Sequence, residues 1–129
     1  MTKKVRDFIN SVMADAQIQA WTGGRVFEFT TPQGTHEYPF IFWFYISDKA
    51  MTTDLQGAGQ AWQAEIQITC FSQTPQGADE LARIVYNAFT TAPRTDGILH
   101  CYSTQVIPLY IDTDEATQYA IRIFINYQL

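Results

Sequence analysis

The densest group of residues that could do chemistry is acidic. Asp112, Asp114 and Glu115 place three carboxylates within four positions, and carboxylate oxygens are ligands that divalent cations such as Ca²⁺ prefer. A calcium loop needs further oxygen ligands and a glycine at its sixth position, where this chain has Thr117. The pattern therefore favours a solvated acidic turn between two strands, and we expect no metal there.

Two histidines and two cysteines are the other candidates. His36 stands beside Glu37 without the two-His, one-Glu spacing of a helical zinc site, and His100 falls in an expected strand. Cys70 and Cys101 each lie in an apolar stretch, which predicts two buried free thiols and a reducing compartment. A four-ligand site would need a tertiary arrangement that no spacing indicates.

Patterns typical of enzymes are missing from the sequence. No serine stands in a nucleophile-elbow pattern, and the glycines at 23–24, 57 and 59 lack the lysine and the strand-then-helix setting of phosphate-binding loops. We therefore expect no catalytic residue, no cofactor and no metal. The chain is predicted not to be an enzyme.

Composition favours interaction over chemistry. The chain has 129 residues, of which 47% are hydrophobic and 15% aromatic, and this predicts one folded domain over residues 1–129. The net charge of -5 argues against binding that neutralises many phosphates. The aromatic run at 40–46 lacks the interleaved Arg or Lys of a single-strand binder. We expect part of this aromatic surface at protein interfaces, where aromatic residues are enriched.

Neither a secretory signal nor a membrane span is expected. The N-terminal segment mixes acidic and apolar residues, and the longest apolar run, Pro39 to Ile46, is too short to cross a bilayer. The sequence therefore predicts a protein made in a cytoplasm, with no membrane partner.

Hydrophobic periodicity indicates which elements would position these residues. Apolar residues from Val5 to Ala16 recur at spacings of three and four, which predicts an N-terminal helix. Thr74 and Pro75 mark the start of a second helix. Strands are expected near 26–29, at 40–46, at 61–71, at 98–111 and at 119–127. The uniformly apolar strand 40–46 is predicted to be central and covered on both faces, and strand 98–111 to be interrupted at Pro108.

This order, α-β-β-β-α-β-β, predicts a single α+β domain with two helices packed on a mostly antiparallel sheet. Because the other connections are of hairpin length, a parallel crossover is expected only around the second helix. The segment from Ser47 to Gln60 contains two glycines and few aliphatic residues, so we predict a long exposed loop. Loops of that length usually serve a function.

The whole pattern resembles the tail-completion proteins of long-tailed bacteriophages. The resemblance covers nearly the whole chain and includes the N-terminal helix and the stretches "GGRVFEF", "YPFIFWFYI", "DLQGAGQAWQAEIQITCFSQTPQGADELARIVYNAF" and "YAIRIFINY". It implies a structural virion protein of the tail or neck, assembled in the host bacterial cytoplasm. Such a tail terminator caps the head-proximal end of the tail tube as a homohexameric ring, ends tail growth and joins a head–tail connector or stopper protein.

The resemblance also implies that DNA passes through the ring without specific binding. The acidic excess of this chain lies after residue 48, which agrees with a lumen that repels phosphates. Two other classes remain open. A small α+β ligand-binding module or enzyme would need a concave pocket with convergent polar groups, and a non-phage adaptor domain would lack sixfold closure.

A ring needs a heterologous interface, in which one surface meets a different surface of the neighbour. Our first candidate is the expected loop, where two apolar residues stand among charged ones that could fix register: Asp48, Lys49, Met51, Asp54 and Leu55. The alternative is a loop tip without consequence. The second candidate is the basic cluster Lys3, Lys4 and Arg6, which could meet an acidic partner surface or form a solvated helix end.

Overall fold

The computed structural model describes residues 2–28, 37–52, 61–94, 97–110 and 117–128, with side chains except at 52 and 104–110. Within these ranges the chain forms three helices and five strands. In order they are α1 (Lys3–Met13), α2 (Ala16–Thr22), β1 (Val26–Glu28), β2 (Phe40–Thr52), β3 (Ala61–Ser72), α3 (Pro75–Thr91), β4 (Ile98–Tyr110) and β5 (Thr117–Gln128).

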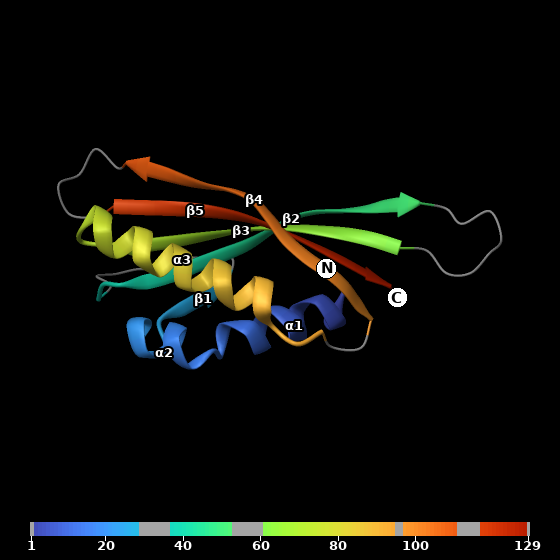
Figure 1. Ribbon diagram of the computed structural model, residues 1–129, viewed down its shortest axis with the longest axis horizontal. Coiled ribbons are helices and arrows are strands. Elements are labelled where there is room, and N and C mark those ends of the chain that lie inside the picture. Colours follow the sequence, from blue (N-terminus) through green and yellow to red (C-terminus); the bar gives the residue numbers. More distant parts are fainter. Residues whose placement is uncertain (1, 29–36, 53–60, 95–96, 111–116, 129) are drawn as a thin grey trace.

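The strands form one mixed sheet in the order β1-β2-β3-β5-β4. β1 is parallel to β2, and the other three neighbouring pairs are antiparallel. The three helices lie together on one side of this sheet, and the β2–β3 hairpin extends beyond them at one end of the molecule (Figure 1). The α+β class and the mostly antiparallel sheet are confirmed.

The prediction of two helices was wrong, because the N-terminal helical segment is divided. α1 ends at Met13, and Asp15 starts α2 by accepting hydrogen bonds at Oδ1 from the amides of Gln17 (2.9 Å) and Ile18 (3.3 Å). Gly23 ends α2 with a left-handed backbone at φ 61°. The observed order is therefore α-α-β-β-β-α-β-β, with Ala16 in the second helix rather than the first.

The expected parallel crossover around α3 is present: β3 and the edge strand β4 run in the same direction, with β5 between them. A parallel pair was not expected elsewhere, and here the prediction was wrong. β1 and β2 are parallel neighbours, which pair from Val26 with Ile41 to Glu28 with Trp43. β4 is not interrupted at Pro108, which faces Tyr119 in the ladder; an edge strand tolerates proline because its outer amides need no ladder partner.

The hydrophobic core lies between the sheet and the helices. α1 contributes Val5, Phe8 and Ile9, and α3 contributes its expected buried stripe, including Leu81, Val85 and Phe89. The helix-facing residues of β3 and β5 follow the predicted alternation and are buried: Ile66, Ile68, Cys70, Ile121, Ile123 and Ile125. Most residues that alternate with them are half-buried, whereas Thr69 and Ala120 are buried as well. The Thr74 hydroxyl caps α3 by accepting from the Gly77 amide at 3.0 Å.

Two expectations about β2 need correction. The central strand is β3, and β2 is covered by helices on one face only: Ile41 and Trp43 are buried there, whereas Phe42 and Phe44 on the other face are half-buried. In addition, residues 47–52 are not a loop but the second half of β2. A register shift between Tyr45 and Ser47 breaks the alternation there, which is why the sequence pattern missed the continuing strand.

Candidate assembly surfaces

The face of the sheet opposite the helices carries an ordered set of aromatic and polar side chains, which we call the open face. Across β2, β3, β5 and β4, partners in register bring these residues together in rows. Phe40 stacks on Phe71 with ring centroids 4.4 Å apart. Tyr102 stacks on Phe124 at 5.2 Å, and the exposed His100 stacks on Tyr102 at 5.3 Å.

Polar side chains of the open face bind one another. Arg122 Nη1 donates to Glu65 Oε1 at 2.7 Å, and Arg122 Nε donates to Gln67 Oε1 at 3.3 Å. Gln63 Nε2 donates to the Tyr102 hydroxyl at 2.7 Å. These polar groups therefore bind partners within the open face, beside its aromatic rings.

Large apolar side chains are exposed where the strands are irregular. In β2 the pairing register shifts at Ile46 and again at Met51, and in β4 it shifts at Leu99. These three side chains are 37%, 42% and 50% exposed, respectively. A bulge places an extra residue in one strand and redirects its side chain, so the irregularities move these three apolar groups away from the core.

Asp48 is held within the chain. Its Oδ1 accepts a hydrogen bond from the Tyr127 hydroxyl at 2.8 Å, and Tyr45 also bonds to it. Burial first, and then the bond to Asp48 and its charge, raise the pKa of Tyr127 to about 12. The same causes raise the pKa of Tyr45. The bulge at Ile46 makes this possible, since residues 45 and 48 would face opposite sides of a regular strand.

The other residues of the first candidate segment lie differently. Lys49 is exposed on the open face, opposite Gln63, and Met51 is exposed near the end of β2. Asp54 and Leu55 lie outside the described residues. The side chains of Lys49 and Met51 are therefore exposed at the projecting end of the hairpin, whereas that of Asp48 is half-buried.

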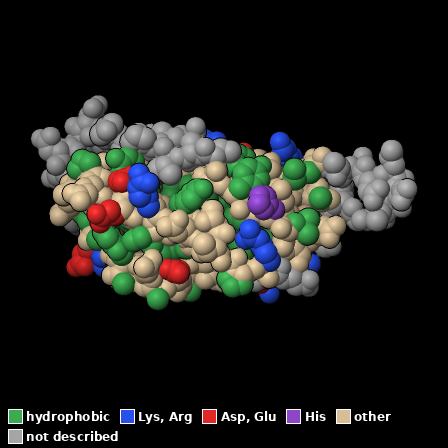
Figure 2. Space-filling model, viewed as in Figure 1, with side chains coloured by type: hydrophobic (Ala, Val, Ile, Leu, Met, Phe, Trp, Pro, Cys, Tyr) green, Lys and Arg blue, Asp and Glu red, His purple; other side chains and the backbone are tan. Residues whose placement is uncertain are grey.

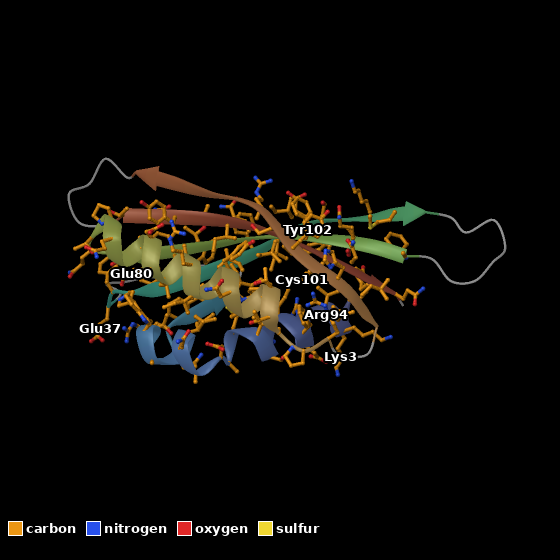
Figure 3. All side chains as sticks on the ribbon, in the orientation of Figure 1. Lys3, Glu37, Glu80, Arg94, Cys101 and Tyr102 are labelled. Carbon is orange, nitrogen blue, oxygen red and sulfur yellow. The ribbon has the colours of Figure 1, made fainter. Side chains whose placement is uncertain are left out.

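The basic cluster lies at the same end of the molecule. Lys3 pairs with Asp7 at 3.2 Å and Arg6 with Glu28 at 3.1 Å, while the exposed Lys4 extends beside Gly97 at the start of β4. Lys3 and Arg94 lie near this end and Glu37 and Glu80 near the other (Figure 3). In Figure 2, acidic side chains on the viewed face gather toward the end where α3 begins. Basic side chains lie there too, since Arg25 pairs with Glu37 and Arg83 with Asp79.

The cysteines and the described histidine, which the sequence offered as candidates for a chemical site, do not come together in the structure. Cys70 and Cys101 are buried free thiols, as predicted, and burial raises the pKa of Cys101 to about 11. Both lie on the helix side of the sheet with β5 between them, whereas the adjacent His100 lies on the open face. His36 and the carboxylates Asp112, Asp114 and Glu115 lie outside the described residues. Among the described residues, no three His, Cys, Asp or Glu side chains could hold a metal.

A depression of about 260 Å³ lies between the α1–α2 corner and the end of α3. Its charged residue, Asp15, already caps α2. The depression therefore offers no set of convergent polar groups of the kind that fixes a ligand. Within the described ranges, no helix is long and apolar enough to cross a membrane.

Sequence reasoning missed three residues that the structure makes prominent: Ile46, Leu99 and Tyr127. Ile46 and Leu99 fall within the expected strands 40–46 and 98–111, but bulges expose them. Tyr127 falls at the end of the expected strand 119–127, but its bond to Asp48 joins positions 79 apart. A signal for the first bulge was the change from the apolar run 40–46 to the mixed segment 47–51.

The described residues thus form a mixed sheet with helices on one side and with aromatic and exposed apolar side chains on its other side and edges. Comparison with known proteins identifies the family: residues 8–118 match the family described as tail completion protein gp17. Because this match spans most of the chain, the protein belongs to that family and is a structural virion protein of bacteriophage tails.

A solved structure supports the fold. A chain of the "Virion of native gene transfer agent (GTA) particle" is similar with a TM-score of 0.76, over 97% of this chain and 95% of that one. The two are 13% identical, so the likeness concerns the fold alone. A search of curated proteins found no significant match.

Proposed function

We propose that residues 1–129 form one tail-terminator domain that caps the head-proximal end of the phage tail tube as a ring of six. The ring ends tail growth and offers a docking surface to the head–tail connector or stopper protein. The observation that carries this proposal is membership of the tail-completion family over residues 8–118. The likeness in fold to a chain of a gene transfer agent virion supports it.

The distribution of exposed groups suits such a role. Lys49 and Met51 are exposed on the projecting hairpin, and the basic cluster lies at the same end of the molecule. We assign contact with a neighbouring copy or the tail tube to this end, together with Asp54 and Leu55, and we assign to Lys3, Lys4 and Arg6 the contact with an acidic partner surface. The net charge of -5 suits a channel through which DNA slides without specific binding. Assembly takes place in the host bacterial cytoplasm.

The test is capping of purified tail tubes. The protein is mixed with tubes that are still growing, and tube length and end structure are followed by negative-stain imaging, with light scattering for the mass of the free protein. We expect sixfold rings at one end and an end to growth. Tubes that keep growing, with no ring at either end, would refute the proposal.

A variant of the protein tests in the same assay whether residues 49–55 are needed for capping. Residues 49–55 are replaced by a Gly/Ser linker, leaving Asp48 and its bond to Tyr127 in place. We expect capping to be lost while the protein stays folded. The matched control is a Tyr86→Ser variant, since Tyr86 is exposed on α3 at the other layer of the molecule. Normal capping by the linker variant would remove this segment from the account.

A further inference from the structure

Both outer strands of the antiparallel part of the sheet have an open side. β4 is the last strand, with β5 as its neighbour. β2 is bordered by β1 only from Ile41 to Trp43, so among the described strands none pairs with the outer side of residues 44–52. We call this stretch the β2 edge and the outer side of Ile98–Tyr102 the β4 edge. Such edges expose backbone donors and acceptors that can pair with another chain.

The two edges lie at the same level of the sheet. Following the pairs across it, Tyr45 is in one row with Ile66, Ile123 and Ser103. Ala50 is in another row with Trp62, Tyr127 and Ile98. Residues 45–50 of β2 therefore stand level with residues 98–103 of β4, on opposite sides of one sheet.

Strand direction makes the edges complementary. The strands β2, β3, β5 and β4 alternate in direction, since each neighbouring pair is antiparallel. The two outer strands therefore run in opposite directions. When a second copy is placed beside the first by rotation, its β2 runs antiparallel to the first copy's β4, and the alternation continues across the junction.

Each edge also presents apolar side chains. Ile46 and Met51 are 37% and 42% exposed on the β2 edge, and Leu99 is 50% exposed on the β4 edge. All three stand at register shifts. Such bulges hinder indiscriminate edge pairing, so a partner must match side chains as well as backbone, and that requirement favours one specific neighbour over general aggregation.

We propose that the β4 edge of one copy joins the β2 edge of the next at the same level, with Leu99 packing against Met51, because Leu99 stands between the rows of Lys49 and Ala50. This inference rests on the ring proposed above and names the contact that closes it. Because each copy has one edge of each kind, the contact is heterologous and repeats around a rotation axis. β1 covers Ile41–Trp43 and so limits the junction to the end of the sheet where the hairpin projects.

The test uses Met51→Lys and Leu99→Glu, alone, mixed and combined in one chain. Each single variant places a charge against an apolar residue at every junction, so we expect each alone to lose the ring. The double variant pairs the introduced ammonium group with the introduced carboxylate at every junction and should regain it. An equal mixture of the two single variants should also regain it, as alternating copies in an even-membered ring. Ring mass is measured by light scattering and imaging, in solution and on tail tubes.

The control is Tyr86→Lys, since Tyr86 is 37% exposed, close to the 42% of Met51, but lies on α3; it should keep the ring. Thermal unfolding of every variant establishes that it is folded. Rings formed by both single variants would refute the edge contact while leaving the ring itself intact. Loss in both single variants without recovery in the double variant or the mixture would refute the pairing of these two edges. If the unaltered protein forms no ring even on tubes, the proposed function fails, and this inference fails with it.

Discussion

At the scale of single residues, Asp48 is an interface candidate whose side chain instead forms hydrogen bonds within its own chain. Its carboxylate lies halfway along β2 and binds Tyr127 from the last strand. Tyr127 also bonds to Thr2, the N-cap of α1. Hydrogen bonds thus connect Thr2, Tyr127, Asp48 and Tyr45 in sequence, and they join residues near both ends of the protein to β2.

We expect Asp48→Ala to destabilise the fold by about 1–3 kcal/mol. Tyr127 is only 1% exposed, and its hydroxyl would lose its hydrogen-bond acceptor. Asp48→Asn keeps an oxygen acceptor and should cost less. Urea unfolding measures both. Lys49→Ala is the control: it is one position away and exposed, so a change within about 0.5 kcal/mol is expected. Equal stability of Asp48→Ala and Lys49→Ala would contradict the structural role of Asp48.

At the scale of elements, local signals decide where helices begin and end. Lys3–Met13 and Ala16–Thr22 could have formed one helix by apolar spacing alone, but Asp15 has an extended ψ of 137° and binds two amides of the following turn. The resulting corner directs α2 along the sheet, where Ile18 and Thr22 are buried. Strand boundaries were less predictable because bulges in β2 and β4 shift the alternation that reveals a strand.

Asp15→Ala tests the cap of α2. Removing the side-chain oxygen leaves the amides of Gln17 and Ile18 without this acceptor, so we expect a loss of about 1 kcal/mol in the free energy of unfolding. Asp7→Ala is a matched control, since Asp7 is exposed and only pairs with Lys3 one turn away; its expected effect is about 0.3–0.5 kcal/mol. Equal losses in thermal or urea unfolding would mean that Asp15 does not act as a cap.

At the scale of the whole molecule, the sheet separates the core from the surfaces that we propose for assembly. Its helix side is a closed apolar core, whereas its open face and edges carry half-buried aromatic rings and exposed apolar residues. The projecting hairpin, the β2 and β4 edges and the basic cluster all lie toward the same end (Figures 1 and 3). The contacts that we propose at this end would therefore leave the core undisturbed.

Two aliphatic substitutions test that separation. Ile123→Ala removes a side chain that is 0% exposed on the helix side and should cost about 2–5 kcal/mol. Leu99→Ala removes a side chain that is 50% exposed at the β4 edge and should change stability by no more than about 0.5 kcal/mol. Denaturant unfolding of the free protein compares them. A large loss for Leu99→Ala would show that this edge belongs to the core rather than to an assembly surface.

Local pattern alone was sufficient to determine the α+β class, the Thr74 cap of α3, the alternation of β3 and β5 and the two buried thiols, and the resemblance identified the family. These features depend on residues close in sequence, whose spacing matches the period of a helix or strand. Tertiary structure alone decided the pairing of β1 with β2, the strand character of residues 47–52 and the bond between Asp48 and Tyr127. These features depend on contacts between positions distant in the sequence and on bulges that shift the register. Local periodicity predicts neither, because it reports only on residues that are close in the sequence.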